Sequence, residues 1–241
     1  MFGFKGLNKS LISNGLVLYI DAANRQSFEP GTTNAYDLIK IARRSDNQNI
    51  FNAFLNNGVG WSSDYGGIFT FDGVDDFMQI NSISNDTLLS LKKQTASVWV
   101  RQRGGATSFI TIGTTSNDNN RNCYLYGNNT TFLRYLIGNG STNRLCTINS
   151  GMPGLNTWFN IVGTYDLQTM RLYINGSEVQ TTSTTIIPLQ STSLFSRFGE
   201  RTQPSTAKFE GDMASWAVYN RALTANEVQQ NFEALRGRFG I

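Results

Sequence analysis

The stretch from Trp158 to Val179 constrains the fold of this chain more than any other. It contains two short apolar runs separated by the polar break 166–169, and the turn dipeptide Asn175-Gly176 follows the second run. In the first run both alternating faces are apolar: Phe159, Ile161 and Tyr165 share one face, and Trp158 and Val162 share the other. A strand that is apolar on both faces belongs inside a layered structure.

The second run predicts a strand with one dry and one wet side, because Leu172 and Ile174 share one face while Arg171 and Tyr173 share the other. Segment 22–38 reads as a loop with a turn at Pro30-Gly31, and 47–57 is a short strand or an irregular segment. Between the strands, 114–122 reads as a long polar loop without an apolar anchor. Further strands are expected at 15–21, 66–72, 77–80, 94–103, 108–113, 122–127, 131–138, 145–148, 194–199 and 208–219. Many short strands without a long helical period predict an all-β, two-sheet antiparallel sandwich.

One helix is expected, close to the end of the chain. Thr224 and Glu227 form a capping-box pattern, and Val228, Phe232 and Leu235 repeat at helical spacing. Gly237 is expected to stop the helix at the C′ position. No linker or internal repeat divides the chain, so we predict an N-terminal arm at 1–14 and a single domain at 15–241.

Composition excludes several classes of function. Charged residues make up 15% of the chain, the net charge is +3, and lysine and arginine are scattered, so we expect no binding of nucleic acid. Histidine is absent, which removes the usual general base and the commonest metal ligand. The start of the chain lacks the apolar core of a signal peptide, and no apolar run is long enough for membrane insertion. In the absence of an oxidising route, Cys123 and Cys146 are expected to stay free.

Four motifs carry a family resemblance. They are the hairpin WFNIVGTYD…LYING, the segment FDGVDDF at 71–77, TASVWVR at 95–101 and FEGDMASWAVYNRALTANEV at 209–228. Together they resemble the laminin-G-like, concanavalin-A-like lectin and glucanase domains, over about residues 15–235. The resemblance implies a jelly-roll sandwich and names no activity, because one fold hosts many functions.

The two ends of the chain carry a narrower similarity. NGLVLYIDAAN at 14–24 and QQNFEALRGRFGI at 229–241 look like the ends of laminin-G-like proteins encoded by tailed bacteriophages. This similarity implies a virion component, assembled in the host cytoplasm. The terminal segment 1–14 is either a frayed end or a docking arm. We expect it to order on other virion proteins, with the domain in several copies on the particle or as a homo-oligomer.

Asp72, Asp75 and Asp76 are the densest acidic group. Related domains hold calcium, and three carboxylates on a bend offer hard oxygen ligands. The alternative is that the side chains fix the turn around Gly73 by hydrogen bonds to the backbone. Relatives offer an Asp-Glu pair in the closing strand, where this chain has Ala214 and Ser215. We therefore expect no bound metal and no cofactor, and little dependence of stability on calcium.

Two further sets of residues bear on sugars. Relatives that cleave β-glucans carry a run of acids on one strand, whereas here Glu210 and Asp212 are separated by a glycine and lack a third acid. We interpret these two as solvated rim charges and expect no catalytic residues. Trp99, Tyr124, Tyr126 and Tyr135 could stack on sugar rings, but inward-facing aromatic side chains of a sandwich mostly form the core.

Three hypotheses follow from the sequence. The first is a non-enzymatic structural protein of a phage particle, as a head decoration, fibre or tail appendage that is exposed and able to adhere to host glycans. The second is a free-standing carbohydrate-binding lectin domain. The third is a glycan hydrolase, which the pattern of carboxylates disfavours.

Overall fold

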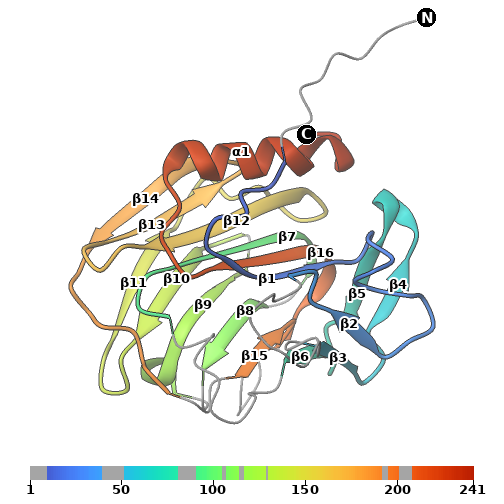
Figure 1. Cartoon of the computed structure of the whole chain (residues 1–241), viewed down its shortest axis with the longest axis horizontal. Helices are drawn as coiled ribbons and strands as arrows, with labels where there is room; N and C mark the ends of the chain where they lie inside the picture. The colour runs from blue at the N-terminus through green and yellow to red at the C-terminus, as the bar shows by residue number, and fades with distance from the viewer. Residues whose placement is uncertain are drawn as a thin grey trace, which may run out of the picture.

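The strands of the chain lie in two antiparallel sheets that pack face to face, and one helix covers the outer face of one sheet (Figure 1). The computed structural model describes residues 10–39, 52–80, 91–104, 107–113, 117–128, 130–191, 195–200 and 208–241. This arrangement confirms the predicted all-β jelly-roll sandwich with one short C-terminal helix. In the described part of the chain, no helix is long and apolar enough to span a membrane.

The first sheet, called sheet A, has β16 near its centre, flanked by β7 on one side and by β1 and β5 on the other. Its order is β14 (Ser177–Ser183), β13 (Thr169–Ile174), β12 (Trp158–Tyr165), β7 (Gln94–Gly104), β16 (Glu210–Tyr219), β5 (Ile68–Asp72) and β4 (Gly60–Ser62), with β1 (Leu16–Asp21) also on β16.

The second sheet, called sheet B, has the order β11 (Asn143–Ile148), β10 (Leu133–Gly138), β9 (Arg121–Gly127), β8 (Thr107–Gly113), β15 (Phe195–Phe198), β6 (Phe77–Ile80), β3 (Asn52–Asn56) and β2 (Asn34–Tyr36). Three single turns of 3-10 helix complete the description: η1 (Asp64–Gly66), η2 (Asp118–Asn120) and η3 (Arg236–Arg238).

The main core lies between the sheets, and β12 contributes to it as predicted. Phe159 and Ile161 point into this core, whereas Trp158 and Val162 lie on the outer face of sheet A, where the C-terminal segment covers them. Gly163 allows the sheets to approach closely, because a Cβ atom there would lie 2.6 Å from the ring of the buried residue opposite it, Tyr135. Both faces of β12 are therefore dry for two different reasons: sheet B covers one, and the helix covers the other.

The helix α1 (Ala225–Leu235) starts as the sequence predicts. The Thr224 hydroxyl accepts a hydrogen bond from the Glu227 N–H at 3.3 Å, and the Glu227 carboxylate accepts one from the Thr224 N–H at 2.9 Å. Gly237 occupies the predicted C′ position, since α1 ends at Leu235 and its C-cap is Arg236, but it does not turn the chain away from the helix. The chain passes directly into η3, Gly237 does not adopt a left-handed conformation, and Gly240 does, with φ of 72°. The last turn therefore continues far enough to bury Phe239.

The prediction that the face of β13 with Arg171 and Tyr173 contacts solvent is wrong in part. Arg171 is half-buried and pairs with Asp166 at 2.9 Å, but Tyr173 is only 1% exposed. Tyr173 packs with Leu223 and Val228, because the start of α1 lies over this side of the strand. The alternation in the sequence indicated the two faces correctly, but it could not show that a later segment covers one of them.

Other departures from the sequence-based expectations are short edge strands. β2, β4 and β14 were not predicted, since they are brief or lack an apolar alternation. Segment 47–57 contains the strand β3, while residues 40–51 lie outside the described residues. Part of the predicted polar loop 114–122 forms η2, whose first residue follows an Asn117 cap. Cys123 and Cys146 are buried free thiols, as expected.

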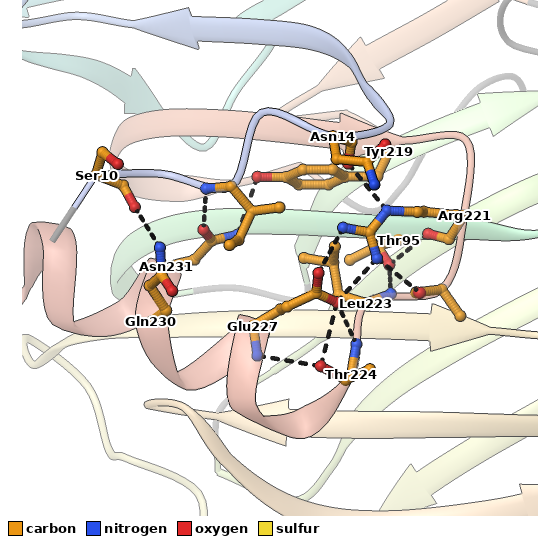
Figure 2. A network of polar contacts seen from close by, with 12 residues as sticks. Ser10, Asn14, Thr95, Tyr219, Arg221, Leu223, Thr224, Glu227, Gln230 and Asn231 are labelled. Atoms are coloured by element: carbon orange, nitrogen blue, oxygen red, sulfur yellow. Dashed lines mark hydrogen bonds and ion pairs between the residues drawn. The ribbon is translucent and has the colours of Figure 1, made fainter.

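The described residues of the predicted arm, Ser10–Asn14, contact α1 and the segment that leads into it (Figure 2). The Ile12 N–H donates to Asn231 Oδ1 at 2.8 Å, and the Gln230 side-chain amide donates to the Ser10 carbonyl at 2.9 Å. This part of the predicted arm therefore contacts the domain. Residues 1–9 lie outside the described residues, and the arm stays a prediction for them.

Candidate functional site

The acidic bend joins β5 to β6 and is fixed by its own hydrogen bonds. Asp72 Oδ1 accepts from the N–H groups of Val74, at 2.8 Å, and Asp75, at 3.4 Å, and Asp76 Oδ2 accepts from the Asp72 N–H at 2.9 Å. Gly73 between them has φ of 80°, a left-handed conformation that suits glycine. The turn-fixing role expected from the sequence is thus present in the structure.

The same bend concentrates negative charge. One carboxylate oxygen from each of Asp72, Asp75 and Asp76 lies within 4.8 Å of the others. Asp76 is 4% exposed, and its Oδ1 has no hydrogen-bond partner among the described residues. Burial, aided by the neighbouring carboxylates, raises the pKa of Asp76 to about 6, whereas backbone N–H groups lower the pKa of Asp72. Oxygen ligands of this kind suit a hard divalent cation, and Asp76 Oδ1 is the atom that such an ion would satisfy.

Glu210 and Asp212 lie beside this bend on β16, where Glu210 is in register with Asp72. Asp212 is fully buried, and its carboxylate accepts from Arg101 Nε at 2.8 Å and from Arg103 Nη1. The interpretation of Asp212 as a solvated rim charge is therefore wrong. Since both oxygens of Asp212 are occupied by arginine, the two acids do not form a pair of free carboxyl groups of the kind that glycoside hydrolysis needs.

An exposed aromatic side chain, Tyr65, lies next to these arginines. Its ring is edge-on to the buried Trp158 at 5.4 Å, and the Arg101 guanidinium lies over both rings, at 5.3 Å and 5.5 Å. Arg101 Nη1 donates to the Tyr65 hydroxyl at 3.3 Å, and Arg238 Nε donates to the Tyr65 carbonyl at 2.5 Å. Tyr65 itself has φ of 52°, a left-handed conformation that is uncommon for a bulky residue.

These contacts hold Tyr65 in place at a conformational cost. A residue in a sparsely populated backbone region persists only where its surroundings fix it, and such residues are concentrated at functional sites. Tyr65 remains 38% exposed, while Arg101 and Arg103 keep 24% and 36% of their side chains exposed. We refer to Tyr65, Trp158, Arg101 and Arg103 as the Tyr65 platform. It offers solvent the exposed part of the Tyr65 ring, over which the Arg101 guanidinium lies.

The aromatic residues singled out from the sequence have other roles. Trp99 is stacked between Phe232 and Phe239 beneath α1, and Tyr135 is fully buried in the main core. Tyr124 is 2% exposed and stacks on the half-buried Tyr126, with ring centroids 4.2 Å apart. Of these four residues, Tyr126 alone offers an accessible side chain.

Sequence reasoning did not identify the Tyr65 platform. Tyr65 follows Trp61 in a segment without periodicity, and Arg101 was placed only as a polar residue on a strand. The contacts join residues up to 173 positions apart, so no local pattern could reveal them. The one available signal was the tryptophan at the start of β12, Trp158, on the face that does not point into the main core.

The family can be assigned at this point. The family model described as "Concanavalin A-like lectin/glucanases superfamily" matches residues 72–229, well over half of the chain. The chain belongs to this superfamily. A search of curated protein sequences found no match.

Solved structures confirm the fold of this concanavalin A-like domain. The binding domain of botulinum neurotoxin serotype D is similar with a TM-score of 0.65 and 14% identity, over 91% of this chain and 51% of that one. A structure described as "Binding domain of Botulinum Neurotoxin DC in complex with SialylT" gives 0.66 and 12%, over 92% and 52%. The domain therefore spans about half the length of these structures. At this level of identity the similarity shows a shared fold alone.

Proposed function

We propose that this concanavalin A-like domain is a non-enzymatic structural component of a phage virion, a head decoration, fibre or tail appendage, that adheres to glycans of the host surface. The observation that carries the adhesive role is the Tyr65 platform. A sugar ring presents an apolar C–H face and a rim of hydroxyl groups. The exposed part of the Tyr65 ring can contact the apolar face, and the Arg101 guanidinium that lies over this ring can supply N–H donors to hydroxyl groups.

Rigidity strengthens this proposal. Binding costs less conformational entropy when the contacting side chain is already held in its bound position. Arg101 and Arg238 fix the ring and the backbone of Tyr65 before any ligand arrives. The neurotoxin described above was solved in complex with SialylT, which is consistent with saccharide binding on a protein that includes this fold.

The proposed place on a virion rests on the two ends of the chain, which resemble those of phage-encoded proteins. In the structure these ends lie together: Arg238 Nη1 pairs with Asp21 at 2.7 Å, and Ser10–Asn14 contact α1 and the segment that leads into it. We propose that the arm at residues 1–14 contacts other virion proteins on this side, with several copies on each particle. Mass spectrometry of purified particles tests this directly. Recovery of the chain only in the soluble fraction of infected cells would contradict it.

A glycan array tests the adhesive role, with Tyr65→Ala as the variant. Phe54→Ala is the matched control, because Phe54 is an aromatic residue of similar exposure, 43%, on sheet B. We expect Tyr65→Ala to weaken binding by about tenfold, the loss typical of an aromatic anchor, and Phe54→Ala to leave it unchanged. Equal losses in both variants, or no bound glycan for the wild type, would contradict the proposal.

The free-standing lectin and the glycan hydrolase remain the alternatives. Glycan binding by a chain that is absent from particles would favour the lectin. Release of reducing sugar from a bound polysaccharide, lost in Glu210→Gln, would favour the hydrolase. We expect no release, because Asp212, the acid nearest to Glu210 along the strand, is held by Arg101 and Arg103.

A further inference from the structure

Seven arginines among the described residues lie over an aromatic ring. Six of them also pair with a carboxylate: Arg25 with Glu29, Arg101 with Asp212, Arg121 with Asp118, Arg197 with Glu200, Arg236 with Glu233 and Arg238 with Asp21. The seventh is Arg134, which forms no ion pair with any described residue. Within the described part of the chain, its positive charge is therefore not compensated by a carboxylate.

Arg134 lies on the outer face of sheet B. It is in β10, where its neighbours Leu133 and Tyr135 point into the main core, so its own side chain points away from it. It is in register with Tyr126 on β9 and Thr147 on β11. All three are half-buried, so this end of the sheet is accessible to solvent.

The Arg134 guanidinium packs against aromatic rings but makes few hydrogen bonds to the described residues. It lies 4.0 Å from the ring centroid of Phe132 and 5.8 Å from that of Tyr126. Its one hydrogen bond to a described residue, from Nη1 to the Tyr126 hydroxyl, is 3.5 Å long and therefore weak, and its buried Nε has no partner among those residues. The aromatic rings lie against the guanidinium, and apart from this weak bond its Nη groups have no hydrogen bond to a described residue.

We propose that Arg134, Tyr126 and Phe132 bind the carboxylate of an acidic saccharide. A planar guanidinium matches a carboxylate in geometry, and the pair is stronger where both groups are partly withdrawn from water. The Tyr126 hydroxyl and the flanking rings provide contacts for the sugar that bears the carboxylate. A single cation does not suit a polyanion such as nucleic acid, which needs several phosphate contacts.

This inference rests on the proposed glycan binding for its class of ligand, but its residues are separate from the Tyr65 platform. The two can therefore fail independently. Loss of acidic binding in an Arg134 variant but not in Tyr65→Ala would support this site and leave the platform untested by that ligand. Loss of neutral-glycan binding in Tyr65→Ala but not in the Arg134 variant would support the platform alone.

Isothermal titration with tetragalacturonate and with its methyl ester tests the site. Methylation removes the charge of each carboxylate and leaves the sugar rings unchanged, so the first comparison needs only the wild type. We expect the acid to bind about tenfold more tightly than the ester, as for a hydrogen bond between two charged groups, and the difference to shrink at high salt. Equal affinity for acid and ester, or no binding of the acid, would overturn the proposal.

Variants identify the residue. Arg134→Gln should abolish the preference for the acid, and Arg134→Lys should retain only part of it, because lysine lacks the planar fork. Arg144→Gln is the matched control: it removes the same charge from the neighbouring strand β11, at an exposed position that faces the other way. Equal losses in Arg144→Gln would indicate a general charge effect and overturn the site. A dimer that dissociates in Arg134→Gln would make a second copy the occupant, with the same consequence.

Discussion

On each outer face of the sandwich an arginine lies over aromatic rings, but the arginine has a carboxylate partner on sheet A and none among the described residues on sheet B. On sheet A, Arg101 lies over Tyr65 and Trp158, and Asp212 neutralises it. On sheet B, Arg134 lies over Phe132 with no carboxylate beside it among the described residues. In the first case the arginine positions an aromatic ring, whereas in the second the rings position an arginine. The comparison teaches that the charge around a cation–π contact, more than the contact itself, indicates which partner is left for a ligand.

The largest expected difference between the two faces is in stability, because α1 covers the outer face of sheet A and the Phe54 ring on sheet B is exposed. Phe232→Ala removes a ring that stacks on Trp99 at 5.6 Å beneath α1, and it should lower the free energy of unfolding by about 3–5 kcal/mol. Phe54→Ala, on the outer face of sheet B, should cost less than about 0.5 kcal/mol because the ring is largely in solvent. Urea unfolding measures both. A small effect of Phe232→Ala would mean that α1 contributes little to the domain.

The next largest difference in stability is expected between variants that change the charges around Arg101 and around Arg134. Asp212→Asn leaves two arginines without their carboxylate and should cost toward the lower end of about 3–5 kcal/mol, since both arginines keep some contact with water. Arg134→Gln breaks no ion pair within the described residues and should cost about 1 kcal/mol, the value of its cation–π contact. Both are compared by urea unfolding at pH 7. A similar loss in the two variants would remove the distinction between the clusters.

A buried acid, Asp37, which has no arginine partner among the described residues, extends the comparison. Asp37 is 5% exposed, accepts two backbone hydrogen bonds through Oδ1, and has no partner for Oδ2 among the described residues, so burial raises its pKa to about 7. The folded state therefore holds this proton more tightly than the unfolded state, whose carboxyl pKa is about 3.9. The contribution of the protonated Asp37 carboxyl to the free energy of unfolding is fully present below about pH 4. It is lost as the pH rises through about 7.

Glu227 acts in the opposite direction, because Arg221 and the helix cap lower its pKa to about 2. Its contribution is present above about pH 4.5 and is lost as the pH falls through about 2. The melting temperature should therefore rise on acidification from pH 8 to about 5 and fall below about pH 4. Asp37→Asn should flatten the first change, because it removes a carboxyl group whose contribution to the free energy of unfolding changes by up to about 1.4 kcal/mol per pH unit. A melting temperature that falls steadily from pH 8 to 5 would contradict this account.

The smallest expected effect is that of calcium. Since Asp72 and Asp76 fix the acidic bend through backbone hydrogen bonds, a chelator should leave the melting temperature nearly unchanged. An ion present at a hundred times its dissociation constant would instead contribute about 2.7 kcal/mol. A drop of several degrees in chelator, reversed by calcium, would show that Asp76 Oδ1 is a ligand.

The sequence predicted those parts of the fold that local chemistry decides. The alternation in β12, the turn at Asn175-Gly176 and the cap at Thr224 each involve residues that are neighbours along the chain. It could not predict what covers a surface. Tyr173 and Asp212 are buried by segments distant in sequence, so their patterns suggested solvent.

The candidate sites were less predictable than the fold for the same reason. Asp72, Asp75 and Asp76 are close together in the sequence, and they were found. The Tyr65 platform depends on contacts across 36 and 173 positions, which bring Arg101 and Arg238 to one tyrosine. Arg134 differs from the other stacked arginines only by lacking an acid among the described residues, a property that appears only when strand register is known.

An NMR titration tests most directly that the domain binds glycans at two chemically distinct places. The Trp158 indole N–H reports on the Tyr65 platform, and the Arg134 Nε–H reports on sheet B. The account predicts that a neutral saccharide shifts the Trp158 signal and leaves Arg134 unchanged, and that tetragalacturonate shifts the Arg134 signal. If both signals stay fixed with every saccharide, or if the neutral ligand moves Arg134 as much as the acidic one, the account is contradicted.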